Sequence, residues 1–128
     1  MPFLSYKKLS DIENTPQVST GSCASLVMYF TRVGPASLWK EGDAVKGNKT
    51  IKRGTAIATF VAGKYPNNPH DNHAALYVSQ NATGVEVLDQ WDSKKTITKR
   101  TMKFLGKNKD GTYVDPSNNG DAMSIIEH

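Results

Sequence analysis

The sequence contains a single cysteine and no long run of apolar residues. One cysteine excludes an internal disulfide, and without a second thiol the common spacings of zinc-binding cysteines are absent. No apolar stretch approaches the roughly 20 residues that a membrane-spanning helix needs. The first ten residues, MPFLSYKKLS, lack the apolar stretch and the cleavage site of a secretory leader. We therefore expect synthesis in the cytoplasm without a signal peptide, and no insertion into a membrane.

The length, composition and charge are those of one soluble globular domain that mildly favours anionic partners. Of the 128 residues, 38% are hydrophobic and 22% are charged, so we expect residues 1–128 to form a single domain with one core. The net charge of +4 is compatible with attraction to an anionic cell wall. The densest basic group lies in a segment that alternates like a strand and comprises Lys94, Lys95, Lys99, Arg100 and Lys103. We interpret it as a solvated strand face and expect no nucleic-acid partner.

One segment, residues 23–33, has the periodicity of an amphipathic helix. The apolar residues at helical spacing are Cys23, Leu26, Val27, Phe30 and Val33. Ser22 or Thr20 can cap the first turn. Gly34 and Pro35 are expected to end the helix, because glycine relaxes the backbone and proline cannot continue the hydrogen-bond ladder.

Four later segments are rich in β-forming residues and are bounded by turn formers. They are residues 55–61, 73–79, 85–91 and 96–105. The loop between the second and third segments, residues 80–84, is short and contains Gly84, which predicts an antiparallel hairpin. Residues 123–126 are expected to return as an edge strand, whereas residues 1–20 and 38–54 are interpreted as an irregular arm and connecting structure. One helix followed by antiparallel strands predicts an α+β fold.

Cys23 opens the predicted helix. Unpaired backbone N–H groups and the positive end of the helix dipole favour a negative charge there, and so favour the nucleophilic thiolate. The same N–H groups can hold the oxyanion that forms on an attacked carbonyl. A cysteine on the apolar face of a helix is also often only a small core residue, so Cys23 alone does not decide between the two interpretations.

His73 begins the second predicted strand directly after a polar loop. Its imidazole is therefore expected at the end of the sheet, where a catalytic base can act. His70 is a rival, but it lies next to Pro69 in the loop and is expected to be less rigid. His70, Asp71 and His73 together hint at a metal, yet no further ligand of a suitable type is close in sequence. We expect His73 as the base, and no metal or other cofactor.

A polar residue of the next strand can orient His73. In a short hairpin the end of one strand lies opposite the start of its partner, so Asp89 or Gln90 can neighbour the imidazole. A carboxylate there would fix the tautomer and stabilise the imidazolium. Asp89 is preferred because it keeps parity with Val87 and, across the sheet, with Ala75. A β-bulge would favour Gln90 instead, and the sequence leaves that choice open.

These residues stand in motifs that resemble the NlpC and CHAP families of cell-wall cysteine peptidases. The motifs are GSCASLV at residues 21–27, GTAIATF at 54–60, NHAALYV at 72–78 and VLDQW at 87–91. The resemblance covers residues 17–105 and implies a papain-like fold, in which a cysteine at a helix N-terminus faces a histidine of a small antiparallel sheet. Mapped by motif, the implied triad is Cys23, His73 and Asp89. The chain also resembles the amidase effectors that bacteria inject into rivals by type VI secretion.

The chain departs from the family pattern at two positions. CHAP enzymes often have glutamine directly before the nucleophile, where this chain has Ser22, so the second oxyanion donor is open. Gln17 lies six residues before Cys23, matches the spacing of papain-like proteases and is a candidate donor; Ser22 and Gln90 are further candidates for oxyanion or substrate contacts. Many CHAP proteins have asparagine two residues beyond the acid, where this chain has Trp91, which we interpret as a core residue.

The resemblance implies a hydrolase that cuts an amide in a peptidoglycan stem peptide or cross-link. An effector of this kind is expected to act in the periplasm of a target bacterium and to meet a cognate immunity protein. The alternative is a non-catalytic domain of the same fold that binds the wall or a partner. Tyr65, Tyr77 and Trp39 are each compatible with a substrate cleft, but each is interpreted as a core residue.

Overall fold

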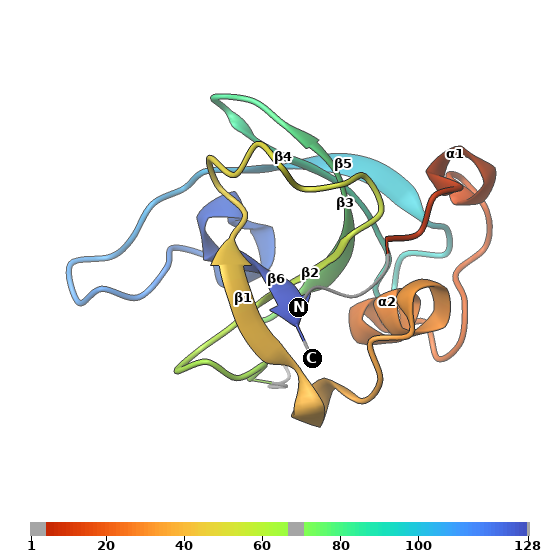
Figure 1. Ribbon diagram of the computed structural model, residues 1–128, viewed down its shortest axis with the longest axis horizontal. Helices are drawn as coiled ribbons and strands as arrows, with labels where there is room; N and C mark the ends of the chain where they lie inside the picture. Colours follow the sequence, from red (N-terminus) through yellow and green to blue (C-terminus); the bar gives the residue numbers. More distant parts are fainter. Residues whose placement is uncertain (1–4, 67–70, 128) are drawn as a thin grey trace.

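The fold is known from a computed structural model, which describes residues 5–66 and 71–127. Its centre is an antiparallel sheet of six strands in the order β1-β6-β2-β3-β4-β5 (Figure 1). The strands are β1 (Lys40–Ala44), β2 (Ala56–Thr59), β3 (Ala74–Gln80), β4 (Gly84–Asp89), β5 (Thr98–Lys103) and β6 (Met123–Glu127). The α-helices are α1 (Leu9–Ile12) and α2 (Cys23–Thr31), and the 3-10 turns are η1 (Ala36–Leu38), η2 (Pro116–Asn118) and η3 (Gly120–Ala122). The predicted α+β class is confirmed.

Helix α2 begins where the sequence predicts. Ser22 is its N-cap, and the Ser22 hydroxyl accepts a hydrogen bond of 3.2 Å from the backbone N–H of Ser25. Its residues Leu26 and Val27 are fully buried, and the helix packs on β3. The helix ends two residues earlier than predicted, because Arg32 already has a left-handed backbone with φ of 61°.

The sheet separates two apolar clusters. One lies under α2 and includes Leu26, Leu76 and Leu88. The other lies on the opposite face and includes Val85 and Met102. This division follows the alternation of side chains along each strand. The predicted hairpin is also confirmed: β3 and β4 pair antiparallel, with one irregularity in register between residues 77 and 79.

Two expectations about strands are wrong. Residues 40–44, which were expected to be connecting structure, form β1, an edge strand whose KEGDA sequence is mostly exposed and shows no apolar alternation. Strand β6 is not at the edge, because it pairs with β1 on one side and β2 on the other. The irregular N-terminal arm contains the single turn of helix α1. In the described part of the chain no helix has the length and apolar character needed to cross a membrane.

Candidate active site

The N-terminal end of α2 and the start of β3 meet at a cleft of about 480 Å³. Cys23 is the first residue of the helix, and His73 directly precedes the strand. Both residues line the cleft. The fold therefore brings together two residues that are 50 positions apart in sequence, at the helix end where a negative charge is favoured.

The imidazole of His73 lies between Cys23 and Asp89. Its Nε2 is 2.7 Å from Oδ2 of Asp89, the last residue of β4. Cys23 lines the same cleft, and its interaction with His73 lowers the pKa of the Cys23 thiol. The backbone of His73 is held by Thr59 of β2, because the His73 N–H donates to Oγ1 of Thr59 at 3.0 Å and the Thr59 N–H donates to the His73 carbonyl at 2.9 Å. The ring thus projects from a fixed backbone.

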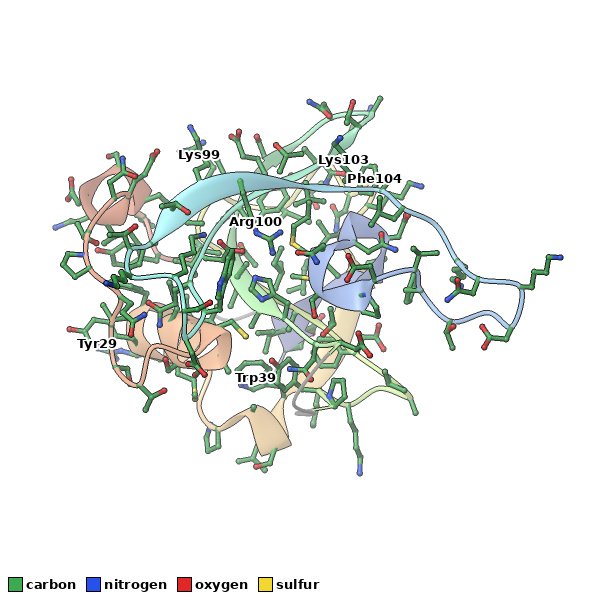
Figure 2. The ribbon with its side chains drawn as sticks, turned by 180° about the vertical axis from the view of Figure 1, so that it is seen from behind. Tyr29, Trp39, Lys99, Arg100, Lys103 and Phe104 are labelled. Carbon is green, nitrogen blue, oxygen red and sulfur yellow. The ribbon has the colours of Figure 1, made fainter. Side chains whose placement is uncertain are left out.

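Asp89 is fully buried and accepts hydrogen bonds from two cations as well. Lys94 Nζ donates to Oδ1 at 2.6 Å, and Arg100 Nε donates to Oδ2 at 2.6 Å. Figure 2 shows Arg100 pointing from β5 toward the middle of the molecule, whereas Lys99 points away. The interpretation of the basic segment as a solvated face is therefore wrong for Lys94 and Arg100. The alternation along β5, which places Arg100 on the same face as buried Met102, was the available indication.

The pKa values of the three residues shift in the directions that an ionised site needs. Burial raises the pKa of the Cys23 thiol, but the hydrogen bond and the charge of His73 outweigh burial, and the net pKa lies below its ordinary value. Burial lowers the pKa of His73, but its hydrogen bonds to Asp89 and Cys23 leave the net pKa raised. Burial opposes ionisation of Asp89 too, yet its hydrogen bond to His73 and the nearby cations lower its pKa to about 2. These directions favour a thiolate beside an imidazolium.

A further polar side chain, that of Tyr65, reaches the sulfur, and Asn72 contacts the Tyr65 hydroxyl. The hydroxyl of Tyr65 is 3.6 Å from Sγ of Cys23, and Nδ2 of Asn72 donates to that hydroxyl at 3.0 Å. The interpretation of Tyr65 as only a core residue is therefore incomplete, although Tyr65 is buried and packs on Trp39. No pattern in the sequence distinguishes a buried tyrosine of the core from one that reaches a site.

Two of the predicted oxyanion or substrate contacts point elsewhere. Gln17 is committed to the loop after β4, because its Nε2 donates to the carbonyls of Lys94 at 2.9 Å and Trp91 at 3.4 Å. Gln90 is fully buried and ties that loop to the start of α2, since its amide donates to the carbonyls of Val18 and Ser22 at 3.0 and 2.9 Å. Neither Gln17 nor Gln90 contacts the cleft among the described residues.

The remaining predicted positions divide between the cleft and the undescribed part of the chain. Ser22 lines the cleft while it caps α2. Trp91 is 38% exposed and also lines the cleft, so its assignment to the core is wrong. Lys94 and Arg100 lie over its ring, at 4.3 and 5.3 Å from the centroid. His70 lies outside the described residues. Within residues 5–66 and 71–127 no three histidine, cysteine or acidic residues are grouped as metal ligands would be.

Comparison with known families adds a match over almost the whole chain. Residues 9–126 match the family model described as "Domesticated amidase effector 2". The chain is 41% identical over 134 residues to the "Type VI secretion amidase effector 2 protein" of Salmonella typhi, and this match covers 99% of the chain and all of that protein. It is 36% identical over 106 residues to "Domesticated amidase effector 2" of Ixodes scapularis, and this match covers 82% of the chain and 64% of that protein.

Comparison with solved structures supports the same relationship. The fold is similar to that of "Type 6 secretion amidase effector 2 (Tae2)", with a TM-score of 0.90 and 41% sequence identity. The similarity covers 98% of the chain and 96% of the solved structure. The whole arrangement of the sheet, and not only the segment around the cleft, is therefore shared.

Proposed function

The chain belongs to the Domesticated amidase effector 2 family, and on that premise we propose that it is a cysteine amidase that hydrolyses amide bonds in bacterial peptidoglycan. Cys23 is the nucleophile, His73 is the acid and base, and Asp89 orients His73. One observation carries the proposal: a cysteine at a helix N-terminus shares a cleft with a histidine whose Nε2 lies 2.7 Å from a buried carboxylate.

The reaction proceeds in two halves. The Cys23 thiolate attacks the carbonyl carbon of the amide, and the oxyanion that forms is stabilised by backbone N–H groups at the start of α2. The imidazolium of His73 then protonates the leaving amine, and the C–N bond breaks to give a thioester. Neutral His73 next takes a proton from water, the resulting hydroxide attacks the thioester, and the sulfur leaves as a thiolate. Asp89 keeps the imidazole in one tautomer throughout.

We extend the proposal to the fold name, the substrate and the place of action. The contact of α2 with β3, with a cysteine at the helix tip, supports a papain-like assignment for a single domain. The family and the net charge of +4 support an amide of a stem peptide or cross-link in the anionic wall as substrate. The name of the Salmonella typhi relative supports secretion and action in the periplasm of a target bacterium, where a cognate immunity protein would block the cleft.

The substitution Cys23→Ala tests the proposal. Purified sacculi are incubated with the intact protein and with the variant, and the released muropeptides are identified by mass spectrometry. Loss of the nucleophile is expected to lower release by roughly 10⁴-fold or more. The masses of the released fragments also identify the bond that is cut.

Ser37→Ala serves as the control, because Ser37 is exposed in η1 and is not among the residues lining the cleft. It is expected to release muropeptides at the rate of the original protein. Release by Cys23→Ala at that same rate would refute the proposal. A protein that releases nothing and whose Cys23 fails to react with iodoacetamide below the ordinary pKa of a thiol would instead be a non-catalytic binding domain.

A further inference from the structure

Tyr65 is a buried residue whose hydroxyl lies 3.6 Å from the sulfur of Cys23. We propose that Tyr65 is a catalytic residue, whose O–H donates a hydrogen bond to the Cys23 thiolate and keeps that sulfur charged before it attacks. The proposal rests on the proposed function, because it assigns a further role in the same reaction. It adds a donor from the loop after β2.

The direction of the hydrogen bond follows from the groups around the Tyr65 oxygen. A phenol carries one hydrogen and can also accept. Nδ2 of Asn72 can only donate, and it donates to the Tyr65 oxygen at 3.0 Å. The phenol hydrogen is therefore not used toward that Asn72 nitrogen and is available to the sulfur at 3.6 Å, a normal separation for a hydrogen bond to sulfur.

The ring of Tyr65 is held so that its hydroxyl keeps this position. It packs against Trp39 with the ring centroids 4.8 Å apart and the planes tilted by 59°. The Trp39 indole is anchored in turn, because its Nε1–H donates to the carbonyl of Gly34 at 3.0 Å, just beyond the end of α2. Figure 2 places Trp39 on the side of the molecule opposite β5. A donor fixed in this way need not be reorganised when the thiol ionises.

Tyr65 also keeps its proton while Cys23 loses its own. Burial raises the pKa of Tyr65, and so do the charge of Cys23 and the hydrogen bond to it, to a value above the usual tyrosine range. The hydroxyl is thus a donor at every pH at which the enzyme would work. Interactions with His73 and with the backbone N–H of Ala74 lower the pKa of the Cys23 thiol as well.

The substitution Tyr65→Phe tests the proposal, because phenylalanine keeps the ring on Trp39 and removes only the hydroxyl. The chain has one cysteine, so the rate of iodoacetamide alkylation as a function of pH reports on Cys23 alone and needs no substrate. The midpoint of alkylation is expected to move to higher pH. A hydrogen bond to a charged group is worth a factor of roughly 10 to 100, so alkylation and muropeptide release on the acid side of the midpoint are expected to fall by that factor.

Tyr29→Phe is the matched control, since Tyr29 is 63% exposed on the same helix as Cys23 and points outward (Figure 2). It is expected to change neither measurement. If Tyr65→Phe only lowers the thermal midpoint and leaves the alkylation profile in place, Tyr65 is a structural residue and the proposal is wrong. This failure differs from failure of the proposed function, in which Cys23→Ala would still release muropeptides.

Discussion

On one face of the sheet, the side chains at the two ends of the β4–β5 pair differ in chemistry: one end is apolar and the other is charged. At the apolar end, Val85 pairs with Met102, and both are fully buried. At the charged end, Asp89 is equally buried but lies among His73, Lys94 and Arg100. Alternate residues of a strand share a face, so Val85 and Asp89 belong to the same row of side chains.

The difference between the two ends indicates which residues contribute to stability alone and which also contribute to the reaction. Burial of the apolar end is favourable for almost any side chain of the right volume. Burial of a carboxylate is costly and is offset only while all its partners are present. The structure meets that condition, because no buried side-chain nitrogen or oxygen of the described residues lacks a hydrogen-bond partner. We therefore expect changes at the apolar end to reduce stability alone, and changes at the charged end to reduce both stability and activity.

The largest effect is expected from Asp89→Asn. The amide keeps the shape but removes the charge, which leaves Lys94 and Arg100 beside His73 without a counter-ion and disfavours the imidazolium. Muropeptide release is expected to fall on the order of 10⁴-fold, and the free energy of unfolding by about 3 kcal/mol or more. Asp43→Asn, on exposed β1, is the control and is expected to change neither quantity. Activity of Asp89→Asn within tenfold of the original would contradict the role of Asp89.

A large effect on stability without loss of chemistry is expected from Met102→Ala. The substitution empties a fully buried site at the apolar end, which typically lowers the free energy of unfolding by about 2–5 kcal/mol. The rate of muropeptide release, measured at a temperature where the variant is folded, is expected to stay unchanged. Urea unfolding supplies the stability. Met28→Ala, at a partly buried position on α2, is the smaller matched change. Slower release by Met102→Ala at unchanged stability would show that the two ends are coupled.

The parts of the fold that could be predicted depend on local patterns. Helix α2 follows from the spacing of its apolar residues and the cap at Ser22. The β3–β4 hairpin follows from the short loop that ends at Gly84. The pairing of β6 between β1 and β2 could not be predicted, because it joins segments such as those around Glu41 and Ser124, 83 residues apart. Such pairing is decided by the assembled sheet and leaves no pattern in either segment.

The same division applies to the candidate site. The chain has one cysteine and three histidines, and both residue types are common in catalytic sites, so the sequence alone indicates Cys23 and His73 as candidates. The predicted hairpin then indicates Asp89 as their partner. Lys94, Arg100 and Tyr65 did not stand out, because lysine and arginine usually lie on the surface and tyrosine often fills cores. Their roles depend on distances across the fold, such as 2.6 Å from Arg100 to Asp89, which composition cannot show.

The smallest effect concerns acid, and it separates the two ends by pH. The pKa of Asp89 is lowered to about 2 from an ordinary value of 3.8. A carboxyl whose pKa is lower in the folded state contributes stability that is complete above about pH 4 and is lost as the pH falls through about 2. The contribution is about 2 kcal/mol. Met102 does not titrate, so the apolar end has no matching dependence.

The test compares the original protein with Asp89→Asn by urea unfolding from about pH 5 to pH 2. Because only the original protein carries the titrating carboxyl, the difference between their free energies of unfolding is expected to shrink by about 2 kcal/mol over this range. The difference between the original protein and Met102→Ala is expected to stay constant, since neither side chain at that position binds a proton. If the difference in free energy of unfolding between the original protein and Asp89→Asn did not change with pH, the buried partners would not be lowering the pKa of Asp89. The contrast between the charged end and the apolar end would then be one of packing alone.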